Sequence, residues 1–295
     1  MSQSLQRTAT LLGAIFLGLA VPSAHFLYFL VPYFIMGMLW VAFLDIRPVG
    51  FRREHLLLLA LNWAVGLAAW SLLLPFNREL AFTALLIGLT PTATASPVIT
   101  GMLGGRVEFV AVSVLVTNVS AGVLFPLALP WLLGANFSIE TAPFLKQTVL
   151  VILVPLLLAQ AIRWGAPDLT RRLLRYRKVS FYLWVTVLFF LTSNAGQFLR
   201  TQWNGNWMQL VELAALSIAL CAINFTLGWK FGGGSGVSRE LSQSLGQKNT
   251  VLTIWIALTY VSPIVALGPT FYIIWHNIYN AWQLARCPVE GADAA

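Results

Sequence analysis

Residues 89–105, LTPTATASPVITGMLGG, lie in a hydrophobic run and yet cannot form one continuous helix. Pro91 has no backbone N–H and disfavours helical conformation at the residue before it. The hydroxyl residues that follow prefer turns and helix caps to helix interiors. Ser96 followed by Pro97 is a helix-start pattern, with a hydroxyl as the N-cap and proline at the first helical position. We therefore expect one helix to end near Thr90 and another to begin at Ser96.

A second interrupted stretch, SLGQKNT at residues 244–250, follows about 153 residues later. Gly246 favours a helix end, and Asn249 followed by Thr250 is a pattern for a new start. Backbone that leaves the helix at membrane depth is tolerated only where it is buried in protein or lines a wet cavity. Paired breaks in two halves of a chain are typical of substrate sites in secondary transporters. They are the strongest indication of function in this sequence.

The composition places the chain in a membrane. It has 295 residues, 58% hydrophobic and 9% charged, with a mean hydropathy of +0.79, whereas soluble domains carry about 25% charged residues. The net charge of +8 comes from basic loops and does not indicate nucleic-acid binding. Cys221 and Cys287 are too few for a disulfide framework. The sequence has no zinc-binding, phosphate-loop or nucleophile-elbow pattern, so we expect no enzyme.

Ten hydrophobic segments follow one another, which predicts an all-α polytopic membrane protein with ten transmembrane helices. They cover residues 8–21, 26–44, 55–74, 80–103, 107–133, 147–162, 179–197, 208–229, 239–261 and 263–284. The first is short and follows Arg7, so a signal peptide is an alternative for it. The first part of the ninth is polar enough to be a cytoplasmic loop instead.

The basic residues orient these segments. The loops and tails on one side of the membrane hold Arg7, Arg47, Arg52, Arg53, Arg106, Arg163, Arg171, Arg172, Arg175, Arg177, Lys178, Lys230, Arg239 and Arg286. The other side holds only Arg78, Lys146 and Arg200. This bias predicts cytoplasmic termini in a plasma membrane of the bacterial inner-membrane type. Five segments in each half, offset by about 153–155 residues, predict an inverted 5+5 repeat of residues 1–140 and 141–295.

Polar side chains at membrane depth are costly, so they mark candidate functional positions. In the broken segments and their neighbours they are Asn62, Thr94, Ser96, Ser113, Thr117, Ser244, Lys248, Asn249 and His276. Each hydroxyl also has a simpler interpretation, a bond to a carbonyl one turn back or a contact between helices. Lys248 is the only clear charge within a span if the ninth segment is one, and a surface lysine otherwise. His276 has the alternative of a satisfied interface histidine.

Two pairs of motifs carry a resemblance to a known family. TATASPVITGMLGG followed by SVLVTNVSAGVLFPLALP resembles the fourth and fifth helices of the bile acid:sodium symporter family. GQKNTVLTIWIAL followed by PIVALGPTFYIIWHN resembles its ninth and tenth helices. The likeness covers about half of the chain. It implies a panel of segments one, two, six and seven, and a core of segments three to five and eight to ten in which segments four and nine cross.

The resemblance also implies a function. Members of the family move small or amphipathic organic anions, such as bile acids and other carboxylates, by alternating access and usually with two sodium ions. The partners implied are therefore the anion, the lipid bilayer and Na⁺, with no other cofactor. The sequence does not name the anion, the direction of transport or the oligomeric state.

The family's functional positions can be carried over residue by residue. On the substrate side they are Thr94, Asn249 and His276. In the first sodium site Ser96, Ser113 and Thr117 match hydroxyl ligands, Pro97 replaces an asparagine and Ser244 replaces a glutamate. In the second site Lys248 replaces a glutamine, and Asn62 stands where the family has a glutamine on its third helix.

Lys248 changes what the resemblance implies. An ammonium cannot ligate a cation, and two unit charges 4 Å apart repel by about 4 kcal/mol at an effective dielectric of 20. We expect altered or lost sodium coupling, with Lys248 acting as a fixed charge, as a titrating group that couples transport to protons, or as a partner of the substrate carboxylate. The alternatives are sodium-independent transport, facilitated or proton-coupled, and a membrane receptor or scaffold that does not transport.

Overall fold

The computed structural model describes residues 3–44, 50–133, 142–176, 179–202 and 205–286. The regular elements of these residues are all helices: α1 (Gln3–Ala20), η1 (Pro22–Leu30), α2 (Val31–Phe43), α3 (Arg53–Leu73), α4 (Arg78–Leu89), α5 (Ser96–Met102), α6 (Val107–Leu133), α7 (Ala142–Gly165), α8 (Pro167–Leu174), α9 (Val179–Gln202), α10 (Trp207–Gly232), η2 (Gly233–Ser235), α11 (Ser238–Gly246), α12 (Thr250–Tyr260) and α13 (Pro263–Arg286). Arg47, Arg177, Lys178 and Cys287 of the sequence analysis lie outside the described residues.

Five of the described helical stretches are long and apolar enough to cross a membrane. They are Pro22–Val41, Arg53–Leu73, Val107–Phe125, Phe181–Thr201 and Trp207–Ser235. The predicted class, an all-α membrane protein, is therefore confirmed. The number of ten crossings, their inverted repeat and the orientation of the termini stay predictions.

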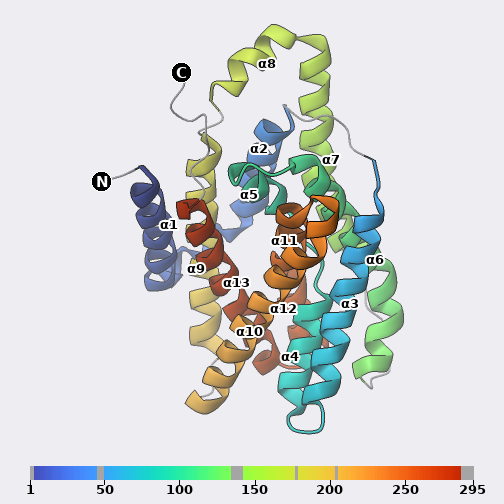
Figure 1. Ribbon diagram of the computed structural model, residues 1–295. Helices are drawn as coiled ribbons and strands as arrows, with labels where there is room; N and C mark the ends of the chain where they lie inside the picture. The colour runs from blue at the N-terminus through green and yellow to red at the C-terminus, as the bar shows by residue number, and fades with distance from the viewer. Residues whose placement is uncertain (1–2, 45–49, 134–141, 177–178, 203–204, 287–295) are drawn as a thin grey trace.

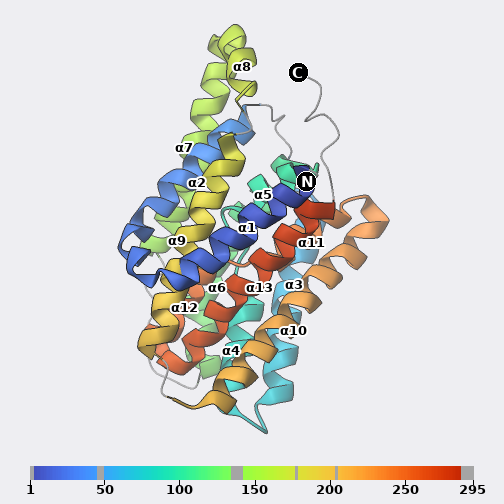
Figure 2. The same ribbon diagram turned by 90° about the vertical axis from the view of Figure 1, so that its left-hand side faces the viewer.

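The helices contact one another in two groups. α1, η1, α2, α7 and α9 form one group, and α3, α4, α10, α11, α12 and α13 form the other. Figure 2 shows α2, α7 and α9 on one side of the molecule and α3, α4 and α10 on the other. α13 also packs against α1 and α9, and α5 packs against α2. The largest cluster of buried apolar side chains joins the first group to α5, α6 and the end of α13.

Glycine allows each half-helix before a break to lie directly against the helix that precedes it. A Cβ on Gly88 of α4 would lie 2.2 Å from the Cα of Gly66 in α3, and a Cβ on Gly228 of α10 would lie 2.5 Å from the Cα of Ser242 in α11. Carbon atoms cannot approach so closely in a packed interior. The α3–α4 pair, visible at the lower right of Figure 1, and the α10–α11 pair therefore each depend on a glycine contact.

Both predicted breaks are confirmed, and one detail of the prediction is wrong. α4 ends at Leu89 and α5 begins at Ser96, while α11 ends at Gly246 and α12 begins at Thr250. Ser96 is the first helical residue of α5 and not its N-cap, which is Ala95. The Ser96 hydroxyl donates to the Gln243 carbonyl of α11 across the crossing.

The ninth segment begins as a helix and not as a loop. Residues 240–246 of α11 are all buried, in contact with α10, α6, α3 and α5. Gly246 ends α11 where a Cβ would lie 2.4 Å from the ring of Phe225, so glycine is needed here for close packing. The cytoplasmic-loop alternative for this part of the chain is therefore wrong.

The glycine contact between α3 and α4 predicts a stability effect. Gly88→Ala forces the two backbones apart and should lower the free energy of unfolding by about 1–3 kcal/mol. Thermal unfolding of the purified protein measures the change. The control is Gly13→Ala in α1, where a Cβ meets nothing within 4 Å, and this helix substitution should be neutral or stabilise by about 0.5–1 kcal/mol. Equal melting temperatures for the two variants would contradict the packing argument.

Candidate functional site

The two breaks meet and pair through their backbones. An isolated antiparallel bridge joins Thr92 to Lys248. The flanking hydrogen bonds run from the Ala93 N–H to the Gln247 carbonyl at 2.9 Å and from the Asn249 N–H to the Pro91 carbonyl at 2.8 Å. Each break therefore supplies the backbone partners that the other has lost. We refer to these paired residues, 90–95 and 247–249, as the crossing.

Side chains complete the hydrogen bonds of the broken helix ends. The last carbonyls of a helix have no partner within it, and a buried carbonyl without a partner is costly. The Thr92 hydroxyl donates to the Ser244 carbonyl at 2.6 Å, and the Tyr272 hydroxyl donates to the Gly246 carbonyl at 2.8 Å. The Ser96 hydroxyl donates to the Gln243 carbonyl at 3.1 Å. Three carbonyls at the end of α11 thus accept from side chains of the first break, α5 and α13.

Two residues of α6 hold the first break in its extended form. The Thr117 hydroxyl accepts the backbone N–H of Thr92 at 3.0 Å, and the Asn118 amide donates to the Thr92 carbonyl at 3.0 Å. The Asn118 side-chain oxygen also accepts from the Asn249 amide at 3.3 Å. Asn118 therefore touches both breaks, and Thr117 contacts the first; the predicted role of Thr117 as a sodium ligand stays a prediction.

The remaining hydroxyls of the predicted sodium positions have different surroundings. Ser113 donates to the Phe109 carbonyl at 3.1 Å, one turn back in its own helix, as the simpler interpretation expected. Thr117 does the same toward the Ser113 carbonyl at 2.8 Å while it accepts from Thr92. The Ser244 hydroxyl is buried and has no hydrogen-bond partner among the described residues.

Lys248 is held in the interior, so the surface-lysine alternative is wrong. Its side chain is 1% exposed. The ammonium donates to the Asn62 side-chain oxygen at 2.5 Å and to the Gly88 carbonyl at 3.0 Å. The structure thus brings Asn62 of α3 into contact with Lys248 of the second break. The family resemblance assigns both residues to the second sodium site.

One face of α13 carries polar groups that lack protein partners. His276 and Asn280, one turn apart, are buried, and His276 Nδ1 and both polar atoms of Asn280 have no hydrogen-bond partner among the described residues. This face is tied to α11 at both ends, by Tyr272 on Gly246 and by the Gln243 amide, which donates to the Gln283 side-chain oxygen at 2.6 Å. Unpartnered polar atoms in a buried layer are an unusual and costly arrangement.

The sequence reasoning singled out His276 and missed Asn280. The spacing of four residues in WHNIYN places Asn280 on the face of His276, and this signal was available without the structure. Thr94 and Asn249, the other predicted substrate-side residues, lie in the crossing and keep partial exposure, whereas Thr92 and Lys248 are buried. The role of these residues in binding stays a prediction.

An ion pair between an exposed arginine and a buried glutamate ties the end of the first broken segment to the start of the second. Glu240, in the first turn of α11, accepts from the Arg106 backbone N–H at 2.8 Å and from its side-chain Nε at 3.1 Å. Arg106 also donates to the Gly236 carbonyl at 2.6 Å. The residues are 134 positions apart, so the sequence carried no local signal of this pair.

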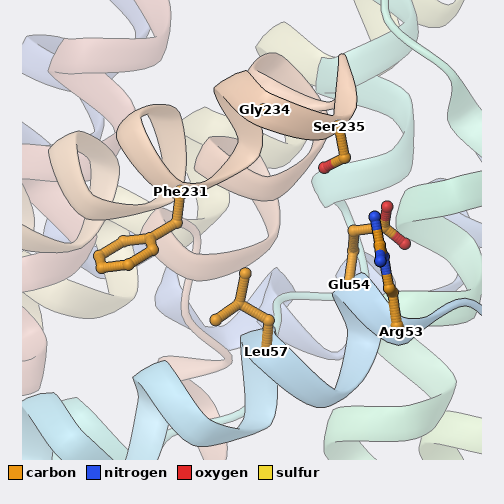
Figure 3. Close-up of a pocket in the computed structure, with 6 residues that line it drawn as sticks. All are labelled: Arg53, Glu54, Leu57, Phe231, Gly234 and Ser235. Carbon is orange, nitrogen blue, oxygen red and sulfur yellow. The ribbon is translucent and has the colours of Figure 1, made fainter.

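A separate cavity lies at the start of α3. Its volume is about 390 Å³, and Figure 3 shows its lining residues, with Phe231 and Leu57 at the apolar end and Arg53, Glu54 and Ser235 at the polar end. None of the predicted site residues lines it. We therefore place the candidate site at the crossing and along the facing polar surface of α13.

The hydrogen bond from Asn118 of α6 to the first break predicts an effect on stability. Asn118→Ala removes the donor to the Thr92 carbonyl and should lower the free energy of unfolding by about 1–3 kcal/mol, because a buried acceptor loses its partner. Thermal unfolding measures this loss. Ser120→Ala, two residues further along α6 and only partly buried, is the matched control and should stay within about 0.5 kcal/mol. A loss of the same size in both variants would show that Asn118 is not a specific clamp.

Comparison with known protein families matches residues 26–202 to the Sodium Bile acid symporter family. This match covers more than half of the 295 residues. A comparison with curated proteins finds no match. The matched region contains the first break and α6, whereas the second break and α13 lie beyond it. The chain therefore belongs to the sodium bile acid symporter family.

Proposed function

We propose that this protein is a secondary active transporter that moves small or amphipathic organic anions across the membrane by alternating access. The observation that carries the proposal is the set of buried, unpartnered polar atoms on α13 and at Ser244 of α11, beside the crossing. Buried polar groups without protein partners are expected to meet a ligand or water. Family membership supports a solute transporter.

The charge near the crossing favours an anion. The ion pairs among the described residues are Arg52–Glu54, Arg106–Glu240 and Arg171–Asp168, and none of them includes Lys248. The ammonium therefore adds a positive charge to the crossing that no described carboxylate neutralises within 4 Å. A carboxylate substrate would complement this charge.

The start of α12 adds a second favourable element. Its N-cap, Asn249, makes no side-chain cap hydrogen bond, and its side-chain NH₂ group donates to Asn118. The N–H groups of a helix's first turn and the helix dipole favour an anion. In this proposal Thr94, Asn249, His276 and the newly found Asn280 bind the polar part of the substrate, and Lys248 supplies the charge.

In this proposal sodium, which the family's description implies, binds at the first of the two predicted positions only. Ser96, Ser113 and Thr117 donate their protons to backbone carbonyls and keep oxygen lone pairs, and Ser244 is uncommitted. These four hydroxyls suit a hard cation, although they contain no carboxylate. A sodium ion held there would supply one further positive charge beside the crossing. We therefore expect at most one coupled sodium ion at these positions.

The two groups of helices supply the moving parts of the proposed cycle. The group of α1, η1, α2, α7 and α9 meets the rest chiefly through α13, α5 and α6. The crossing is held by hydrogen bonds within the other group and α6, so we expect it to move as one body. Displacement of the first group against it would expose the site to alternate sides of the membrane.

Uptake by reconstituted protein tests this function. Purified protein in liposomes should accumulate a labelled carboxylate, with taurocholate as the amphipathic probe and pantoate as the small one, and uptake should saturate and be competed by unlabelled anion. Protein-free liposomes are the control. A carboxylate that binds the protein and is never moved would support the receptor or scaffold alternative. Uptake that follows an imposed pH gradient would assign proton coupling.

The polar face of α13 predicts a specific effect on uptake. Asn280→Leu removes both unpartnered polar atoms and should raise the anion concentration for half-maximal uptake by about tenfold, since losing a buried polar contact costs about 1–3 kcal/mol. Thr270→Ala is the control on the same helix, because the Thr270 hydroxyl donates within α13 to the Ala266 carbonyl. Unchanged half-saturation in Asn280→Leu would remove this face from the substrate site.

A further inference from the structure

The surroundings of the Lys248 ammonium are those of a cation site. Its two acceptors are the amide oxygen of Asn62 at 2.5 Å and the backbone carbonyl of Gly88 at 3.0 Å. Amide and carbonyl oxygens are the ligands that hard monovalent cations take when they lose their water. The side chain is 1% exposed, so it is shielded from bulk water.

The position of Gly88 makes the site favourable for positive charge. α4 ends at Leu89, so the Gly88 carbonyl belongs to the last turn, where the carbonyls have no partner within the helix. The negative end of the helix dipole lies there. The direct contact between Gly66 and Gly88 brings α3 against this end, and Asn62 lies one turn before Gly66 on the same face. The oxygens are therefore positioned by helix packing.

The ammonium is fixed to the crossing through its own backbone. Lys248 is the residue that bridges to Thr92, and its neighbours on both sides donate or accept across the breaks. A free ion at this place could leave during a transport cycle, whereas a side chain cannot leave the protein. The side-chain nitrogen thus occupies this position throughout any transport cycle.

We propose that the Lys248 ammonium permanently replaces a dissociable monovalent cation at the Asn62–Gly88 position. The family's description implies sodium, and this position does not accept it, because the ammonium takes the oxygens that an ion would need. The inference rests on the proposed function and deepens it, because it identifies the Lys248 ammonium as the positive charge beside the proposed anion site. Its test measures sodium binding and does not depend on transport.

The decisive variant restores an oxygen in place of the ammonium. Lys248→Gln leaves the Asn62 and Gly88 oxygens and adds an amide oxygen, so the vacated position should take up sodium. In buffer with N-methylglucamine as the only cation, this variant should melt below the wild type, and sodium should restore its melting temperature with saturation. Lys248→Met, which adds no oxygen, should melt lower and gain no more from sodium than the wild type does.

Equilibrium binding of radioactive sodium gives the second measurement. We expect Lys248→Gln to bind one sodium ion more per chain than the wild type, and Asn62→Leu in the Lys248→Gln background to lose that extra ion. A Lys248→Gln variant that gains no sodium site overturns the proposal. Wild-type protein that binds two sodium ions per chain also overturns it, and this outcome can be read even if the variants do not fold. Failure of anion uptake would leave these sodium counts unchanged and would concern only the proposed function.

Discussion

The antiparallel pairing of the two breaks is the interaction on which the rest of the structure depends. Breaking two helices in the interior leaves backbone groups without partners, and in a membrane water does not replace them. Pairing at Thr92 and Lys248 satisfies part of this need. Hydroxyls of Thr92, Ser96 and Tyr272 satisfy the carbonyls at the end of α11. The residues that look functional in the sequence therefore first serve to make the crossing possible.

The breaks could be predicted because their causes are local. Pro91 removes a backbone donor at the first break, and Gly246 is a residue that favours a helix end at the second. The prediction failed for the cap, because the helix begins one residue earlier and makes Ala95 the N-cap. The Ser96 hydroxyl bonds to α11 across the crossing, and a local capping rule does not include so distant a partner. The loop alternative for α11 failed for a related reason. Its polar residues are buried against other helices and bonded to them, so polarity did not indicate solvent.

The candidate site shows the same division between local and distant causes. The sequence indicated Asn62, Thr117 and Lys248 as polar groups within the membrane, and helix packing decides that Asn62 meets the ammonium while Thr117 meets the first break. The Arg106–Glu240 pair joins residues far apart in sequence, and no local sequence pattern predicts it. Asn280 is a different case. Its spacing of four residues from His276 can be seen in the sequence, but only the structure shows that its polar atoms have no partner among the described residues.

The most direct test of the account is whether the crossing binds an anion without needing sodium. Thermal unfolding of the purified protein would be followed while a carboxylate is titrated in matched sodium and potassium buffers. A ligand that binds the folded state stabilises it by about 2.7 kcal/mol at a hundred times its dissociation constant. The account predicts that the carboxylate raises the melting temperature in both buffers, because Lys248 already supplies a positive charge. A rise seen only in sodium, or no rise with any carboxylate, would contradict it.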